Sequence, residues 1–325
     1  QGTWQQFDLP TNAQLSATVE IKNILYVAGE RGQVFFSKDH GQDWHSFNPV
    51  SSKEAIMWLG FRDNTGYAVT SSSKSHKVYQ YGDIQQAWNK VGEFKRVPGA
   101  SFWVQNGGMF PFFSQAGQLK IINDTKLHEY HAESGKWKTS KTKAIKKFAQ
   151  MQDGSLLGIE VSQWDGYGDQ VFSLDEGKSW SVVSRSLRWG DVKSETSLPA
   201  VLPNKQFITV GRVKKSKDRS LKILSAPFEQ VSKEQLTWQT HGQVKENCAT
   251  LLASLTLNKT LYFQCDQGQV ISTSDLGETW DTAVAIDIAK LQSEYDNLLL
   301  AIKQMAEKNK AESQAKTSEE ESKQQ

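Results

Sequence analysis

The chain has 325 residues, of which 38 are basic and 36 acidic, so its net charge of +2 gives no global field that would attract nucleic acid. It contains no run of about 18 or more apolar residues, which excludes an ordinary membrane-spanning helix. Eleven tryptophans are unusual for a chain of this size, and any interpretation of the fold has to explain where they fall.

In chain order, the first distinctive element is a turn at residues 37–44 that recurs twice. In such a hairpin corner the Asp carboxylate accepts backbone N–H bonds, the Gly takes a positive φ, and the Trp anchors the next strand in the core. Three copies of Ser/Thr-x-Asp-x-Gly-x-x-Trp predict a repeat protein whose corners are structural. The residues that define them are Ser37, Asp39, Gly41 and Trp44; Ser173, Asp175, Gly177 and Trp180; and Thr273, Asp275, Gly277 and Trp280.

The repeat unit is longer than its corner, because residues 26–34 also match residues 262–270 in register. Between the complete corners, Trp88 follows a corner that keeps its Asp, whereas the corners before Trp137 and Trp238 have lost it. The six marks are separated by roughly 40 to 60 residues, the size of a four-stranded propeller blade. We therefore expect an all-β fold, a six-bladed β-propeller over residues 1–285. The aromatic-rich strands at 102–104 and 112–113 fit its interior.

The N-terminal residues 4–9 resemble the strand that follows the first corner. We expect them to form an outer strand that closes the ring against the last blade. Because Trp280 already precedes an equivalent strand, a seventh, degenerate blade stays open as an alternative. The chain begins at Gln1, so we expect a mature periplasmic or secreted product whose signal peptide has been removed, although a trimmed chain would begin in the same way.

The two cysteines, Cys248 and Cys265, flank a segment that reads as two strands joined by a turn at 257–259. A hairpin there brings them nearly opposite each other, where they can form a disulfide in an oxidising compartment. Two small buried apolar residues in a reducing compartment fit the spacing equally well.

From about Asp287 the apolar residues recur at steps of three and four, which predicts an amphipathic helix over residues 286–306. This helix has no place in a blade, so its seam has to dock on the propeller, which we favour, or on a partner protein. Residues 307–325 are almost all polar or charged, which predicts a disordered tail. The seam consists of Ile288, Leu291, Tyr295, Leu298, Ile302 and Met305.

The three corners resemble the Asp-boxes of the bacterial neuraminidase repeat. The longer unit, from Tyr26 through Gly32 to Trp44, most resembles the propellers of the photosystem II assembly and stability factor family. The resemblance covers residues 1 to about 285, and it is specific for fold rather than function. It implies a non-catalytic, extracytoplasmic protein that binds partner proteins. Some relatives of that family accompany resistance-nodulation-division type membrane exporters.

Asp-boxes also occur in sialidases, so a glycan-binding or glycan-hydrolysing protein is the alternative. A sialidase holds its substrate with three arginines, typically beginning in a Phe/Tyr-Arg-Ile-Pro stretch, and uses a tyrosine activated by a glutamate. This sequence has no such stretch, and only Arg62 and Arg212 follow segments suited to strands that end near a channel. Tyr295 follows Glu294, but both belong to the predicted helix. We therefore assign no catalytic residues.

No metal or cofactor site is predicted. His128 and His131 point to opposite faces of a predicted strand, and no carboxylate or Cys completes a ligand set. The histidines at positions 40, 45, 76 and 241 are expected at the surface. Two basic stretches are expected to be solvated loops, with peripheral contact to an anionic membrane as the alternative. They contain Lys138, Lys141, Lys143, Lys146 and Lys147, and Lys214, Lys215, Lys217 and Arg219.

A repeat architecture without catalytic groups predicts a scaffold or assembly factor. We expect the partner to be a membrane protein complex, with an envelope transporter of the resistance-nodulation-division type as one such partner. Neither nucleic acid nor a small-molecule substrate is expected.

Overall fold

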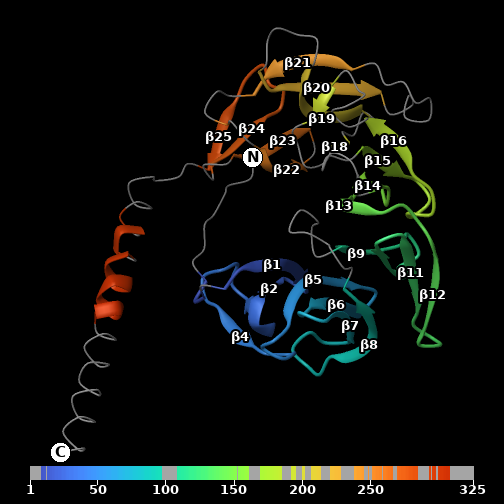
Figure 1. The fold of residues 1–325 in the computed structure, drawn as a ribbon, viewed down its shortest axis with the longest axis vertical. Coiled ribbons are helices and arrows are strands. Elements are labelled where there is room, and N and C mark those ends of the chain that lie inside the picture. The colour runs from blue at the N-terminus through green and yellow to red at the C-terminus, as the bar shows by residue number, and fades with distance from the viewer. Residues whose placement is uncertain are drawn as a thin grey trace, which may run out of the picture.

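The fold is a six-blade β-propeller, as the sequence predicts. The computed structural model describes residues 9–11, 13–96, 108–151, 153–160, 169–184, 192–194, 200–201, 206–213, 220–227, 238–244, 248, 251–257, 259–265, 269–284, 293, 295–297 and 299–307. Within them the strands form six antiparallel sheets, and Figure 1 shows these sheets arranged as blades around a ring. No seventh sheet forms among the described residues.

The first three blades each contain four strands in chain order. The first consists of β1 (Leu15–Ile21), β2 (Ile24–Gly29), β3 (Val34–Ser37) and β4 (His45–Phe47), with a short 3-10 turn, η1 (Glu30–Gly32), after β2. The second consists of β5 (Ala55–Arg62), β6 (Thr65–Ser71), β7 (Ser75–Tyr81) and β8 (Asn89–Lys95). The third consists of β9 (Met109–Phe113), β10 (Leu119–Asn123), β11 (Lys126–His131) and β12 (Lys136–Lys141).

The last three blades follow the same plan, with one additional strand in the fifth. The fourth consists of β13 (Ile145–Gln150), β14 (Leu156–Glu160), β15 (Gln170–Ser173) and β16 (Ser181–Ser184). The fifth consists of β17 (Val192–Ser194), β18 (Ala200–Val201), β19 (Gln206–Val213), β20 (Lys222–Pro227) and β21 (Gln239–Gln243), with β18 pairing beside β17 on β19. The sixth consists of β22 (Leu251–Leu257), β23 (Thr260–Cys265), β24 (Val270–Thr273) and β25 (Asp281–Val284).

Burial changes across each blade because only its outer edge meets water. The strands follow chain order from the centre of the ring to its rim (Figure 1). The second strand of the third blade, β10, is buried at every residue, whereas the outermost strand, β12, has no buried residue. The inner strands that pack between two neighbouring blades are therefore buried on both faces, and exposed residues gather on the outermost strands.

Apolar clusters lie between neighbouring blades and join them. One cluster joins the first and second blades through Ala28, Ile56 and Trp88, and others join the second to the third, the third to the fourth, and the fifth to the sixth. Between the fourth and fifth blades, the rings of Phe172 and Phe207 meet edge to face, 5.4 Å apart. Each blade thus depends on its neighbours to complete its core.

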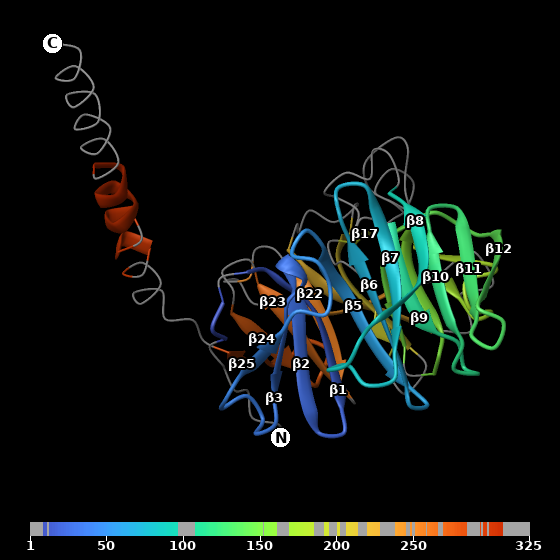
Figure 2. The ribbon, with the colours of Figure 1, turned by 90° about the horizontal axis from the view of Figure 1, so that it is seen from below.

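A C-terminal helix occupies residues 293, 295–297 and 299–307. Figures 1 and 2 place it away from the ring, and its large apolar side chains are exposed, from 47% at Leu299 to 59% at Met305. The prediction that the seam docks on the propeller is therefore wrong for Tyr295, Ile302 and Met305, the seam residues that the structure describes. Ile288, Leu291 and Leu298 lie outside the described residues. No helix in the described part of the chain is long and apolar enough to cross a membrane.

Some sequence predictions fall outside the residues that the structure describes. These are the closing strand at 4–9 apart from Leu9, the aromatic strand at 102–104, the basic stretch at 214–219 and the tail beyond residue 307. The second aromatic segment, Phe112 and Phe113, ends β9 on the inner side of the third blade, with Phe112 2% exposed.

Candidate functional site

The first corner is a closed hydrogen-bonded turn built by Ser37 and Asp39. The Ser37 hydroxyl donates to the Asp39 carboxylate at 2.7 Å and accepts the backbone N–H of Gly41 at 2.7 Å. The same carboxylate accepts the backbone N–H groups of Gln42 and Asp43 at 3.1 and 3.0 Å. The two N–H groups lie in the turn, beyond the paired strands, and the Asp39 carboxylate accepts them in place of a backbone carbonyl.

The other two complete corners repeat this geometry. Asp175 accepts the N–H of Ser179 at 2.8 Å, and Asp275 accepts the N–H of Thr279 at 3.0 Å. Each Gly has a positive φ, but so does the residue before it: His40, Glu176 and Leu276 have φ values of 59°, 59° and 58°. Sequence analysis missed this second left-handed residue, because its side chains share no chemistry. Two consecutive left-handed residues reverse the chain within a short turn. The carboxylate of the corner Asp, which precedes them, can therefore reach the N–H groups that follow them.

The corner tryptophans lie over their own turns. The indole N–H groups of Trp44, Trp180 and Trp280 donate to the corner glycine's carbonyl at 3.1, 3.2 and 3.1 Å. Trp180 also donates to the Thr142 hydroxyl of the preceding blade at 3.1 Å, and Trp280 donates to the Gln243 carbonyl at 2.8 Å. All three are only partly buried. Trp180 and Trp280 fasten their corners to the neighbouring blade and pack against the apolar clusters beside them.

The weaker corners keep part of this arrangement. Trp88 donates to the Ile84 carbonyl at 2.9 Å, and the Asp83 carboxylate accepts the Gln85 N–H at 3.0 Å. Trp137, whose corner lacks the Asp, donates instead to the Val91 carbonyl of the preceding blade at 2.8 Å. A tryptophan bond to the preceding blade is therefore present even where the corner has lost its Asp.

Cys248 and Cys265 form a disulfide, with their Cα atoms 5.1 Å apart. Both are almost completely buried in the apolar cluster between the fifth and sixth blades. The bond ties the start of the sixth blade to the end of β23, the strand beside its innermost strand. It therefore stabilises the blade internally and leaves no thiol exposed at these two positions.

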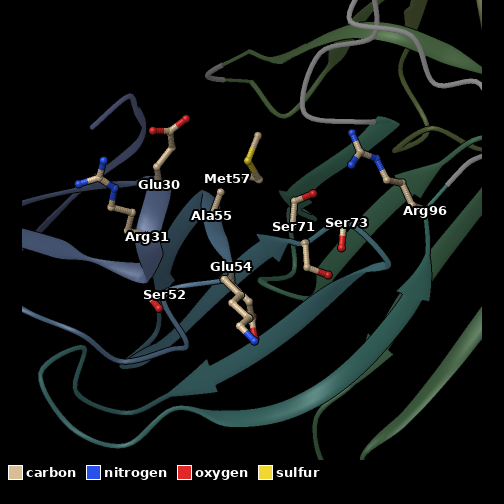
Figure 3. A pocket seen from close by; sticks show the side chains of 11 residues that line it. Glu30, Arg31, Ser52, Glu54, Ala55, Met57, Ser71, Ser73 and Arg96 are labelled. Atoms are coloured by element: carbon tan, nitrogen blue, oxygen red, sulfur yellow. The ribbon is translucent and has the colours of Figure 1, made fainter. Parts of the chain in front are cut away.

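The first two blades carry a shallow cavity of about 370 Å³ at the end of their strands that faces away from the first corner. Its walls come from four loops: the turn after β2, the loop before β5, the loop after β6 and the residue after β8. In an antiparallel meander these loops alternate with the corners, so the cavity and the first corner lie at opposite ends of β3. Figure 3 shows Arg31 and Arg96 on opposite sides, with Ala55 and Met57 between them. We call this cavity the cleft.

The cleft is lined by cations that have no ion-pair partner among the described residues. Arg31, Lys53 and Arg96 all line it, and none lies within 4.0 Å of a carboxylate in that part of the chain. Arg31 is held in the left-handed region at φ 62°, an uncommon conformation for a side chain of this size. Uncommon backbone conformations of this kind cluster at functional sites, so Arg31 draws attention to the cavity.

The carboxylate of Glu54 at the cleft's base is already satisfied. It accepts from the Thr70 hydroxyl at 2.6 Å, from Lys77 at 2.7 Å and from the Tyr79 hydroxyl at 3.1 Å. Burial alone would raise its pKa, but the bonds from Lys77, Thr70 and Tyr79 outweigh this and lower the pKa. Glu54 therefore stays ionised and is neutralised by Lys77. The other carboxylate of the lining, Glu30, has no cation within 4.0 Å among the described residues, so the cleft presents three cations against one unpaired acid.

Tyr79 and Glu54 are the kind of pair that a sialidase would use, but their chemistry here is opposite. Burial and the nearby Glu54 charge raise the pKa of Tyr79 to about 12. A nucleophilic tyrosine needs an easily removed proton, whereas this phenol holds its proton more tightly than usual. The contact with Glu54 therefore does not activate this tyrosine.

Arg62, one of the two arginines considered for a channel, does not line the cleft. Arg62 donates to the backbone carbonyls of Ser114 and Gln115, both at 2.8 Å, and so ties the second blade to the third. The Arg212 side chain lies outside the described residues.

Of the four histidines predicted at the surface, His40 and His45 are exposed, whereas the other two are not. His76 is completely buried, so its assignment to the surface is wrong. His128 bonds to the Thr139 hydroxyl at 2.9 Å, and burial lowers its pKa to about 4. His241 is half-buried and bonds to Ser225 at 2.6 Å. Among the described residues, no three His, Cys, Asp or Glu side chains cluster as metal ligands would.

The first basic stretch divides between two environments. Lys138 and Lys141 are exposed on the outer strand β12. Lys143 pairs with Glu160 at 2.9 Å, and burial lowers the pKa of Lys147 on β13. The five lysines therefore do not form one continuous exposed surface.

Sequence analysis missed the cleft residues because they come from separate loops without a common motif. One signal was present: in the matched segments 26–34 and 262–270, Arg31 stands where the other copy has Gln267. A departure from the repeat inside a loop marks a position that the fold does not require.

The structure is similar to several solved propellers, although no known protein family and no curated protein sequence matches the chain. One similar structure is YCF48 bound to a D1 peptide, with a TM-score of 0.62 and 13% identity over 89% of this chain and 87% of that one. YCF48 from Cyanidioschyzon merolae has a TM-score of 0.60 and 12% identity, over 86% and 88%. A putative 6-phosphogluconolactonase from Bacteroides uniformis has a TM-score of 0.51 and 10% identity, over 82% and 83%. At these identities the similarity shows the fold alone, a β-propeller, while the number of blades comes from the six sheets of this chain.

Proposed function

We propose that this protein is a non-catalytic scaffold that binds an acidic segment of a partner protein in the cleft. The observation that carries the proposal is the set of three cations, Arg31, Lys53 and Arg96, around a cavity whose buried carboxylate is already neutralised. Arginine pairs well with carboxylates because its planar donors match two oxygens at once. An extended peptide with acidic side chains or a terminal carboxylate fits a shallow, open site of this size better than a small substrate, which needs deeper enclosure.

The structural neighbours support a protein partner. One solved structure with the same fold is YCF48 bound to a D1 peptide, so a propeller of this shape accommodates a peptide. We also propose that the three corners are Asp-boxes and that they serve the fold, since their polar groups are satisfied by one another. Recognition is then left to the opposite end of the ring.

We propose an extracytoplasmic location and a membrane protein complex as the partner. The disulfide between Cys248 and Cys265 supports the location, because such bonds persist mainly in oxidising compartments. An envelope transporter of the resistance-nodulation-division type is one candidate complex, and the capture experiment below identifies it.

A glycan-acting enzyme is the alternative, and the sequence argues against it because it contains no Phe/Tyr-Arg-Ile-Pro stretch. Release of the fluorophore from a fluorogenic sialoside by the purified full chain would contradict a non-catalytic role. We expect no release above the rate of a denatured sample.

Capture from membrane fractions tests the proposal. The full chain and the double variant Arg31→Glu/Arg96→Glu would be crosslinked mildly to solubilised membranes and the captured proteins identified by mass spectrometry. The matched control is Lys126→Glu/Lys136→Glu, which makes the same charge change at exposed sites on the third blade. We expect the wild type and the control to capture the same complex and the cleft variant to lose it. Equal capture by all three would overturn the cleft as the binding site.

A further inference from the structure

The lining of the cleft changes in character from one side to the other. Figure 3 shows Arg31 on one side and Arg96 on the other, with Ala55 and Met57 between them. The two cations come from different blades, because Arg31 follows β2 and Arg96 follows β8. Met57 is only partly buried and contributes an apolar surface to the wall. A ligand that spans the cleft therefore meets a cation, an apolar surface and a second cation, in that order.

A β-bulge places Met57 in this position. The pairing of β5 with β6 skips one residue between Ile56 and Trp58, and Met57 is that extra residue. The innermost strands of the first and fourth blades also have a bulge near their first residue, with Ser16 and Lys146 as the extra residues. The fold thus repeats the bulge and accepts different chemistry at it. Since a bulge changes the direction of a side chain, Met57 sets the apolar character of the middle of the cleft.

The two sides of the cleft also differ in charge. Glu30 lies on the same side as Arg31 in Figure 3, and its carboxylate has no cation within 4.0 Å among the described residues. The second lining carboxylate, Glu54, is bonded to Lys77. The side of Arg96 therefore has no unpaired carboxylate from the lining. Because like charges repel, an anion on the side of Arg31 is attracted less strongly than one on the side of Arg96.

We propose that the partner segment is extended and carries an acidic, an apolar and a second acidic residue at alternate positions. This inference rests on the proposed function and specifies the sequence that the cleft selects. Alternate residues of an extended chain share one face, so side chains at i, i+2 and i+4 meet Arg96, Met57 and Arg31 in turn. Figure 3 shows Ser71 and Ser73 between Met57 and Arg96, where their hydroxyls are donors and acceptors for the peptide groups of the segment.

Fluorescence anisotropy of labelled peptides with the full chain tests the pattern. The probe is Ser-Asp-Ser-Leu-Ser-Asp-Ser with both ends blocked, so that no terminal charge contributes. One control replaces Leu with Ser, a second replaces both Asp with Asn, and a third keeps the composition but places the two Asp side by side. We expect the probe to bind about fivefold more tightly than each control, because each control loses an apolar contact or an ion pair. Equal binding of the probe and the rearranged peptide, or no binding of any peptide, would overturn the proposal.

Two variants relate the peptide preferences to particular side chains. Met57→Ser should remove the preference for Leu over Ser and keep the preference for Asp over Asn, and the fold already has Ser16 at the bulge of the first blade. Glu30→Gln removes the unpaired charge but keeps an oxygen that accepts the Gln14 N–H, now bonded at 3.3 Å. It should tighten binding of the probe about two- to threefold and leave the Asn peptide unchanged. A preference for Leu that survives Met57→Ser, or a probe affinity that Glu30→Gln does not raise, would contradict the assignment.

Failure of this inference is distinguishable from failure of the proposed function. If all acidic peptides bind alike and Arg31→Glu/Arg96→Glu abolishes both peptide binding and partner capture, the cleft is the binding site and the alternating pattern is wrong. If that variant captures the partner as well as the wild type does, and no peptide binds either protein, the proposed function itself is wrong.

Discussion

The ammonium group of Lys120 in the third blade lies 2.6 Å from the carboxylate of Glu176 in the corner of the fourth. Its other partner is Glu129, at 2.7 Å on the neighbouring strand. The Lys120 side chain is only 3% exposed. Burial alone would lower its pKa, but the bonds to Glu129 and Glu176 outweigh this and raise it. A charge that sequence analysis would place at the surface therefore lies inside the seam between two blades.

Lys120→Met should destabilise the protein strongly. The substitution keeps an apolar chain of similar length but leaves two carboxylates partly buried without their cation, which typically costs about 3–5 kcal/mol. Urea unfolding measures the change, and Lys136→Met, at an exposed position on the outer strand β12, is the control. A loss from Lys120→Met no larger than the control's would show that the ion pair does not join the blades.

The corner carboxylates should make stability depend on pH. Hydrogen bonds from the Thr279 hydroxyl and N–H lower the pKa of Asp275 to about 2. Because this pKa lies below the unfolded value of about 3.9, the contribution is present above that value and is lost as pH falls toward 2. Asp275→Asn should therefore lower the melting temperature at neutral pH, and the difference from wild type should shrink in acid. A difference that is constant down to about pH 2 would contradict this ionisation.

Gly242→Ala should damage the seam between the fifth and sixth blades. A Cβ there would overlap the carbonyl oxygen of Gly277. Gly242 lies in β21, and hydrogen bonds hold Gly277 in its corner and Gly242 against that corner, so a shift of either backbone breaks these bonds. Overpacking of this kind costs about 1–3 kcal/mol. Gly82→Ala is the matched control, since its Cβ would meet no atom within 4 Å. Chemical denaturation of both variants distinguishes a steric clash from a general effect of losing glycine.

Reduction should weaken the fold and expose two thiols. Protein denatured without reductant should show no free thiol, because Cys248 and Cys265 are bonded. Closing a loop of 17 residues stabilises a fold by about 3 kcal/mol in the chain-entropy description. The replacement of both cysteines by serine should lower the free energy of unfolding by a similar amount. Two reactive thiols in protein isolated from its native source would contradict the disulfide and the oxidising compartment.

Local turn chemistry made the propeller predictable from sequence. Asp39, Asp175 and Asp275 each bond to groups within four residues, so the motif contains the whole interaction. The blade count followed because one tryptophan marks each unit. The motif could not reveal contacts between blades. One example is the bond from Trp180 to Thr142, two residues that are 38 apart in sequence.

The candidate site was not predictable for a related reason. Arg31, Lys53 and Arg96 come from three loops, and only the stacking of two blades brings them around one cavity. His76 was misplaced because a strand's polar residues usually face water, whereas a propeller blade buries both faces of its inner strands. In both cases, packing between blades decides the outcome.

Site-specific photocrosslinking tests the central claim, that the cleft end of the ring is the partner-binding surface. A photoreactive phenylalanine analogue would be placed in the full chain either at Ser73, in the cleft wall, or at Leu174, which is 71% exposed at the fourth corner. After irradiation with membrane fractions, we expect a discrete crosslinked protein from position 73 and none from position 174. Crosslinking from position 174 alone would place recognition on the corner end and contradict the account.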